Sequence, residues 1–309
     1  MHRKRTTRYL PSERPFVVEW ITLTLFLACI LTWGASILWL PSVSLPLAIL
    51  VLAVSLVLHA SLTHEVLHGH PFPSRSLSEA LVIVNPGLFI PYLRFRDTHL
   101  AHHQDANLTD PYDDPETNYL DPVVWLRLAL WVRVLLEVNN TLAGRMLIGP
   151  VLAQVMFMRS DWQAVRMGDR QVALGWALHV PGCIVVLMLV VWAPIPFWAY
   201  LLGCYGALSV LKIRTFLEHQ AHQKARGRTV IIEDRGLLAF LFLNNNFHVV
   251  HHMHPRVPWY RLPALYRASA SRYLACNEGY RYRSYMQVFA RHFLRAKDSV
   301  PHPLWSSDR

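Results

Sequence analysis

Two long stretches of the chain lack charge almost entirely. Residues 16–70 contain no lysine or arginine and only two acidic residues, and residues 171–211 contain no charged residue of either sign. Hydrophobic residues make up 53% of the 309 residues, more than in an ordinary soluble domain. Because a helix needs about 20 apolar residues to cross a bilayer, each stretch is long enough to cross it twice. This pattern argues against a soluble fold and predicts an integral membrane protein.

Prolines interrupt both stretches near their middle. Pro41 and Pro46 divide the first, and Pro194 and Pro196 divide the second; proline ends helices and marks turns. Each stretch therefore predicts a helical hairpin, so we expect an all-α integral membrane fold in one domain over residues 1–309. A cytosolic helical cap, formed by the middle segment and the tail, should cover four transmembrane helices. The predicted spans are residues 17–40, 45–66, 172–192 and 197–216.

Lysine and arginine are also absent from both predicted hairpin turns. The head, residues 1–15, carries five of these residues, and the middle segment and the tail are rich in arginine. Because positively charged segments stay on the cytosolic side, both termini should be cytosolic and both turns external. This bias, together with a role in attracting anionic lipid headgroups, accounts for the net charge of +10. Nucleic acid is therefore not an expected partner. A compact chain of this kind favours the bacterial inner membrane.

Cysteine is scarce, whereas histidine is abundant. The four cysteines have no metal-binding or redox spacing, but most of the 17 histidines fall into clusters. Residues four apart share one face of a helix, which brings the first pair of histidines together at the cytosolic end of the second span. A His-x-x-His-His triplet then occurs twice. The clusters are the pair His64 and His68, the triplet His99, His102 and His103, the triplet His248, His251 and His252, and the pair His219 and His222.

The clusters should meet at one depth on the cytosolic side, because the second and fourth spans both end there. So many imidazoles repel one another and are poorly solvated unless a metal binds their neutral forms. Eight or nine nitrogens are too many for one metal and suit two. Imidazole suits iron, zinc, copper and nickel alike, so the residue type does not choose the metal. The predicted metal ligands are His64, His68, His99, His102, His103, His219, His248, His251 and His252.

Two other classes of protein match part of this pattern. The sequence His64-Glu65-x-x-His68 has the form of a zinc metalloprotease motif, in which the glutamate is the general base. A mononuclear protease, however, has no use for six further clustered imidazoles. A histidine-rich metal transporter is the other alternative, but transporters place their ligands near the bilayer midplane, and these clusters lie outside the predicted spans.

The three histidine boxes, the four-span layout and the length together resemble the membrane fatty acid desaturase superfamily, over nearly the whole chain. This superfamily includes acyl desaturases, acyl hydroxylases and carotenoid ketolases, and His219 stands where it typically has a ninth histidine. The resemblance implies a di-iron oxidoreductase that uses O2 to attack an unactivated C–H bond of a lipid or fatty acyl chain. Desaturation is the first expectation, with hydroxylation or ketone formation as alternatives. The boxes are His64-Glu65-x-x-His68-Gly69-His70, His99-x-x-His102-His103 and His248-x-x-His251-His252.

Polar residues beside the boxes are expected to act on the imidazoles, because metal-bound histidines usually donate their other N–H group to a carboxylate or carbonyl. Glu65 and Asn245 are the predicted catalytic residues, Glu65 as such a partner. Asn245 could hold a metal-bound water, and one of residues 244–246 could instead cap the helix of the third box. Further candidate partners of the imidazoles are Asp97, Asp105 and Glu218. Three acidic residues after the second box, in a stretch that resembles the ketolase and hydroxylase branches, could recognise a lipid headgroup or cap a loop, and the loop is the first expectation: Asp113, Asp114 and Glu116.

A separate protein should supply the electrons. The chain has no His-Pro-Gly-Gly signature of a fused cytochrome b5 and no cysteine cluster for an iron–sulfur centre. We therefore expect a partner such as a ferredoxin or a cytochrome b5, steered by charge onto the basic cytosolic face. The other expected partners are the membrane and a lipid or acyl substrate. The sequence assigns no role to His222 or His254.

Overall fold

The computed structural model describes residues 17–103 and 107–305. The basic head, residues 1–15, and Asp105 lie outside the described residues. Helices dominate the rest of the chain, and the named strands, β1 (Ile231–Ile232) and β2 (Arg281–Tyr282), pair in parallel. The helices are α1 (Trp20–Leu38), α2 (Leu40–Val43), α3 (Leu45–Leu67), α4 (Arg75–Ala80), α5 (Tyr92–His102), α6 (Pro122–Arg127), α7 (Leu130–Asn139), α8 (Leu142–Leu147), α9 (Gly149–Arg166), α10 (Arg170–Trp192), α11 (Phe197–Thr215), α12 (Leu237–Leu241), α13 (His248–Met253), α14 (Leu262–Ala268), α15 (Ala270–Cys276) and α16 (Tyr285–His292), with the 3-10 helices η3 (Ala225–Arg228) and η4 (Trp259–Arg261).

Among the described residues, three helices are long and apolar enough to cross a membrane: α1, α3 and α10, whose boundaries agree with the sequence prediction to within a few residues. The predicted fourth span corresponds to α11, which is not one of these three. Only 28% of the apolar stretch of α1 and of α10 is buried, against 50% of that of α3. The two outer helices therefore leave wide apolar surfaces for lipid, and α3 is the central one. The prediction of a mostly helical membrane protein is confirmed.

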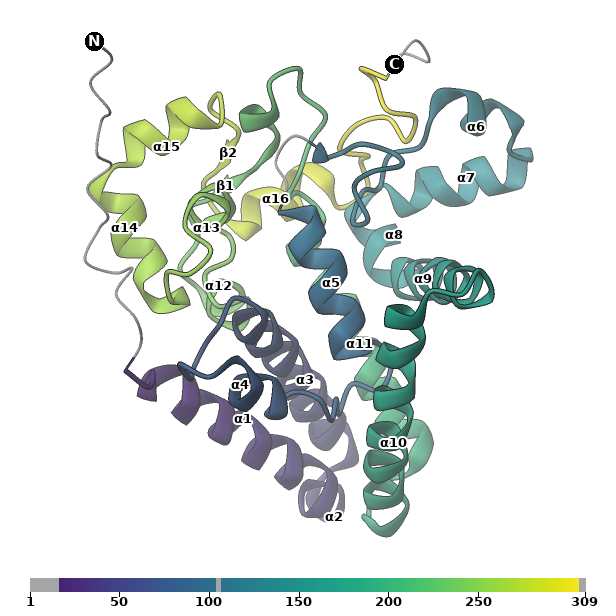
Figure 1. The fold of residues 1–309 in the computed structure, drawn as a ribbon, viewed down its shortest axis with the longest axis vertical. Coiled ribbons are helices and arrows are strands. Elements are labelled where there is room, and N and C mark those ends of the chain that lie inside the picture. Colours follow the sequence, from purple (N-terminus) through teal and green to yellow (C-terminus); the bar gives the residue numbers. More distant parts are fainter. Residues whose placement is uncertain (1–16, 104–106, 306–309) are drawn as a thin grey trace.

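The helix α11 packs along α3, and α3 also contacts α1. A glycine on α11 allows this close approach. A Cβ atom built on Gly203 would lie 2.5 Å from Cδ2 of Leu52, a fully buried residue of α3, and would collide with it. The apolar helices gather in one half of the molecule, and α6, α7 and α13–α16 lie in the other half (Figure 1).

This second half, which we call the cap, consists of residues 92–103, 107–166 and 218–305. Its helix α5 is joined to α9 and to the span α10 by one buried carboxylate. Both guanidinium nitrogens Nε and Nη2 of Arg94 donate to Asp161 at 2.9 Å, and Nε1 of Trp176 donates to the same carboxylate at 2.8 Å. This network fixes the helix that carries the second histidine box against the end of a span.

The helix α13, which carries the third histidine box, is held by the short strand β1 and the residue before it. The amide of Val249 donates to the carbonyl of Val230 at 3.2 Å, and the amide of Ile232 donates to the carbonyl of Asn246 at 2.8 Å. Apolar side chains around Ile231, Val250 and Tyr266 form a separate core beneath it. The two-residue strands thus position one box of histidines.

Candidate metal centre

The nine histidines predicted as ligands meet in two groups, each with its nitrogens within 4.8 Å of one another. We call these the first and the second group. Eight of the nine come from α3, α5 and α13 or the residue that follows each of the first two helices, and His219 follows α11. The first group is His64, His68, His99, His103 and His251, and the second is His102, His219, His248 and His252.

Helical geometry explains how each box divides between the groups. Successive residues of an α-helix are rotated by about 100°, so residues four apart stay on one face while the residue three positions on turns away. Every pair with a spacing of four remains in one group: His64 with His68, His99 with His103, and His248 with His252. The middle histidines of the triplets, His102 and His251, join the opposite group. The two groups are therefore interleaved, and each draws on both triplets.

Distances between neighbouring Nε2 atoms suit imidazoles that share a metal. Ligands at right angles, each about 2.1 Å from a metal, lie about 3.0 Å apart. The observed separations run from 2.8 to 3.2 Å. They are His64–His99 (3.1 Å), His99–His103 (2.9 Å) and His103–His251 (3.2 Å) in the first group, and His102–His219 (2.8 Å) and His219–His248 (3.2 Å) in the second.

Burial keeps most of these imidazoles neutral, which is the form that binds metal. The pKa of five of these histidines is lowered, mainly by desolvation and to a lesser extent by repulsion from neighbouring imidazoles. Buried polar nitrogens normally have a partner, yet Nε2 of His68 has no hydrogen-bond partner among the described residues. A metal would complete such a donor set, so the residues present fit one ion in each group. The lowered pKa values belong to His68, His103, His219, His248 and His251.

Two carboxylates orient histidines through their second ring nitrogen. Oδ1 of Asp114 lies 2.7 Å from Nδ1 of His102, and Oε1 of Glu116 lies 3.1 Å from Nδ1 of His99. Burial opposes the charged form of His102, but the charges of Glu116 and Asp114 outweigh it and raise its pKa to about 9. The carboxylates thus fix Nε2 as the nitrogen that faces the other histidines.

Asp114 belongs to a segment after α5 that we call the acid loop, residues 107–120. Its carboxylate accepts the amide protons of Thr109 and Glu116, both at 2.9 Å, besides its contact with His102. From the sequence we expected these acidic residues to cap a loop. In the structure Asp114 also contacts His102, and Glu116 contacts His99. The separation of 12 residues between His102 and Asp114 concealed the first of these contacts.

The asparagines before the third box do not cap its helix, so the capping prediction is wrong. Phe247 occupies the N-cap position of α13, without a side-chain cap. Asn245 instead presents Oδ1 to Nδ1 of His248 at 3.1 Å and donates from Nδ2 to Glu218 at 2.9 Å. Since the ring of His248 already occupies that amide oxygen, Asn245 holds the imidazole in place.

The remaining predicted partners lie farther from the ligand nitrogens. The carboxylate of Glu65 accepts the amide proton of Trp259 at 3.2 Å and belongs to neither histidine group. Oε1 of Glu218 is 4.0 Å from Nδ1 of His248. Asp97 pairs with Arg96 at 2.8 Å and does not serve the box.

The histidines without a predicted role stay outside both groups. Nδ1 of His222 accepts the amide proton of Lys224 at 3.2 Å. The side chain of His70, the last histidine of the first box, lies 3.0 Å from Glu19 at the start of α1. This contact between two buried polar groups ties the end of the first box to the first span.

Comparison with known proteins decides the class of this centre. A family model described as fatty acid desaturase matches residues 37–285, which include all nine histidines of the two groups. The chain belongs to the fatty acid desaturase family. The resemblance stated from the sequence is confirmed, and membership makes the protein a membrane oxidoreductase of the desaturase and hydroxylase superfamily, a class that implies a lipid substrate.

A curated relative is similar over a large part of the chain. The sequence is 26% identical over 215 residues to a beta-carotene ketolase from Paracoccus sp. (strain N81106 / MBIC 01143). The alignment covers 66% of this chain and 71% of the relative. The similarity supports the same oxidoreductase superfamily for this fatty acid desaturase family member.

Proposed function

We propose that this protein is an O2-dependent di-iron oxidoreductase that oxidises an unactivated C–H bond of a lipid. The observation that carries the proposal is the division of nine clustered imidazoles into groups of five and four. The family is a di-iron class. The first group would hold one iron and the second group the other. When bound, the irons would supply the reduction of O2 that drives removal of hydrogen from carbon.

The protein's own residues would orient the ligands and exclude water. Asp114, Glu116 and Asn245 each contact an Nδ1 atom and direct the opposite nitrogen of the same ring toward the metal. Most of the histidines are buried, His64, His99 and His248 to within 2% of full burial. Glu65 and Asn245, the predicted catalytic residues, would act by positioning. Asn245 holds His248, and Glu65 lies 3.8 Å from Nδ1 of His64 and holds the amide of Trp259.

The substrate in this proposal is a long apolar lipid or acyl chain, and desaturation is the first product we expect. A double bond forms by removal of two hydrogen atoms from the substrate. These two hydrogen atoms, with two electrons from the donor and two protons, reduce one O2 to two waters. The similarity to a beta-carotene ketolase supports a second candidate, insertion of oxygen to give a ketone on a carotenoid. How precisely the target carbon is placed would decide between these outcomes.

We further propose four spans in one domain over residues 1–309, with α11 as the fourth. Its charged residues, Lys212 and Arg214, fall in its last turn, where a span would meet the cytosol. That placement supports a cytosolic cap and cytosolic termini, as in a bacterial inner membrane protein. A separate ferredoxin or cytochrome b5 would deliver electrons to this face.

The position of Glu65 counts against the zinc protease alternative. A protease of that type needs the glutamate beside the metal-bound water, yet Glu65 belongs to neither group and accepts a backbone amide proton. The transporter alternative needs ligands near the bilayer midplane, whereas His64 and His68 lie at the end of α3.

Metal content and product analysis test the proposal directly. Protein purified in detergent from iron-57 cells should contain about two irons per chain, coupled in the Mössbauer spectrum. Cells that express it should accumulate an unsaturated or oxygenated lipid that is absent from cells expressing His251→Ala. One zinc and no iron, in protein made with ample iron, would overturn the proposal and favour the protease.

A further inference from the structure

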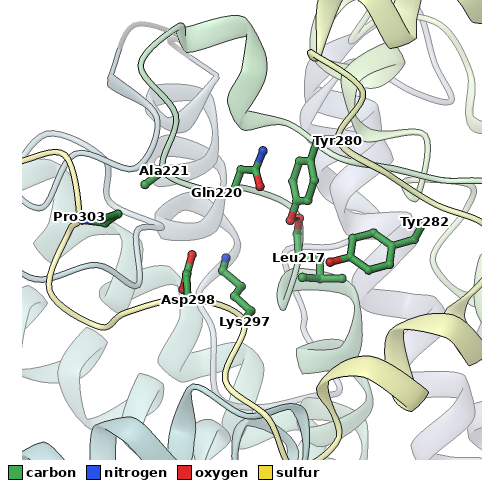
Figure 2. A pocket seen from close by; sticks show the side chains of 8 residues that line it. All are labelled: Leu217, Gln220, Ala221, Tyr280, Tyr282, Lys297, Asp298 and Pro303. Atoms are coloured by element: carbon green, nitrogen blue, oxygen red, sulfur yellow. Dashed lines mark hydrogen bonds between the residues drawn. The ribbon is translucent and has the colours of Figure 1, made fainter.

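A segment near the end of the described chain contacts two other segments. One contains His219 and the residues that follow it, and the other is the acid loop, which holds His102. We call residues 297–302 the clasp. It follows α16 in the cap and belongs to no helix or named strand. Figure 2 shows Lys297 and Asp298 reaching from this segment toward Gln220 and Ala221, the residues after His219.

The first contact is with the backbone of a predicted ligand. The Nζ atom of Lys297 donates to the carbonyl oxygen of His219. The clasp is anchored at the same point to the end of α7, because Nδ2 of Asn140 donates to the carbonyl of Asp298 at 2.7 Å. Lys297 therefore adds a side-chain contact to the backbone of His219, which also bridges to Thr229.

The second contact is with the acid loop. The hydroxyl of Tyr119 donates to Asp298 and accepts the amide proton of Ala221 at 2.8 Å, so it joins the loop, the clasp and the His219 segment. Backbone bonds extend this contact: the amide of Leu120 donates to Val300 at 3.0 Å, and that of His302 donates to Leu120 at 2.8 Å.

The clasp also contacts the acid loop close to its carboxylate. Nε2 of His302 lies 3.3 Å from Oγ1 of Thr109, and the amide of Thr109 donates to Asp114, which holds His102. The chain of contacts from His302 to His102 thus passes through two residues. It ends on the second group, like the contact of Lys297 with His219.

A cavity of about 120 Å³ lies between the clasp and the residues that follow His219, and Gln220 and Ala221 line it together with Lys297 and Asp298. Tyr280 and Tyr282 face Lys297 and Asp298 across it (Figure 2). Packing around the clasp is therefore incomplete at this cavity. Hydrogen bonds and ion–dipole contacts, more than apolar packing, fix its position. Loss of single polar groups should accordingly loosen it without emptying an apolar core.

We propose that the clasp is a positioning element that acts chiefly on the second metal. It contacts the backbone of His219 directly and reaches His102 through Thr109 and Asp114, and both of these histidines belong to the second group. The acid loop also holds His99 of the first group through Glu116, so the first metal should be affected less than the second. This inference rests on the proposed di-iron function. It predicts that weakening the clasp removes one of the two irons and leaves the other.

The test compares metal retention in full-length variants purified in detergent. Tyr119→Phe and the double variant Lys297→Met with Asp298→Asn are titrated with a chelator, and iron per chain and the Mössbauer spectrum are followed. We expect the second iron to leave at about 10–100-fold lower chelator concentration than in the unmodified protein. The remaining iron should give the spectrum of an uncoupled ion.

Tyr282→Phe is the matched control, because Tyr282 lines the same cavity but bonds to His292 at 2.9 Å. It should keep both irons as firmly as the unmodified protein does. If both clasp variants also do so, or lose both irons together, the clasp proposal is overturned while the di-iron function stands. An unmodified protein without iron would overturn the proposed function, and the clasp's role with it.

Discussion

At the scale of single residues, the acid loop shows how a carboxylate can define a metal ligand. Both oxygens of Asp114 accept hydrogen bonds, Oδ1 from His102 and Glu116 and Oδ2 from Thr109. An amide in its place would direct an NH2 group at one of these N–H donors. The charge and the geometry of Asp114 therefore both matter for orienting His102, because both carboxylate oxygens must accept hydrogen bonds.

Replacing Asp114 with asparagine should weaken the second metal site. The variant loses the charge that favours the N–H on Nδ1 of His102, and its amide opposes a backbone donor. We expect a loss of about 10–100-fold in metal affinity or in activity, as for other groups that orient metal-bound histidines. Iron content after dialysis against a chelator, together with lipid product per cell, measures both effects.

Asp113→Asn provides the matched control, because Asp113 is the exposed neighbour in the same loop. It should retain iron and activity like the unmodified protein. Equal iron retention in the Asp113 and Asp114 variants would mean that the carboxylate does not orient His102.

The sequence could predict the nine ligand candidates but not these orienting contacts. The His-x-x-His-His spacing is visible because it is local, whereas Asp114 and His102 meet only after the loop folds back. Asparagines just before a helix commonly cap it, so capping was expected of one of residues 244–246. In the structure Asn245 instead contacts Nδ1 of His248. Short polar side chains have several partners within reach, so spacing alone does not choose among them.

At the scale of elements, the spans were predictable and their contacts were not. Runs of apolar residues set the ends of α1, α3 and α10, since charge and proline stop such helices. The strands β1 and β2 were missed, because two residues are too short for a recognisable pattern. The division of each triplet between two groups follows from helical rotation, but it also needs the relative positions of α3, α5 and α13.

The contact between α3 and α11 can be tested with one substitution made at two positions. Gly203→Ala places a methyl group against the buried Leu52, so the free energy of unfolding should fall by about 1–3 kcal/mol. At Gly206 the added Cβ would be 3.4 Å from Cβ of Ala53, which the packing accommodates more easily. Alanine also favours the helix by roughly 1 kcal/mol over glycine.

Thermal unfolding in detergent separates the two variants. Gly206→Ala should match or exceed the unmodified protein in midpoint temperature, and Gly203→Ala should fall below it. A Gly203→Ala protein as stable as the Gly206→Ala protein would mean that α11 does not pack closely on α3. That outcome would also weaken the case for α11 as a span beside α3.

At the scale of the whole molecule, the two halves have different solvents under the proposed topology. Apolar residues such as Leu31, Ile184 and Val191 remain at least half exposed on the outer helices, where lipid would cover them. The histidine groups lie where these helices meet the cap. A site at that boundary could receive a lipid from the bilayer and electrons from a soluble partner.

Cysteine labelling in intact bacteria tests which side each half occupies. Ser42→Cys lies in the turn between α1 and α3, and Met286→Cys lies on α16, with Met286 75% exposed. Cys276, which is partly exposed in the cap, is first replaced by serine to remove its background. A membrane-impermeant maleimide should label Ser42→Cys in intact cells and Met286→Cys only after the membrane is opened. The opposite pattern would put the histidine groups outside the cell, away from cytosolic electron donors, and would overturn both the topology and the proposed source of electrons.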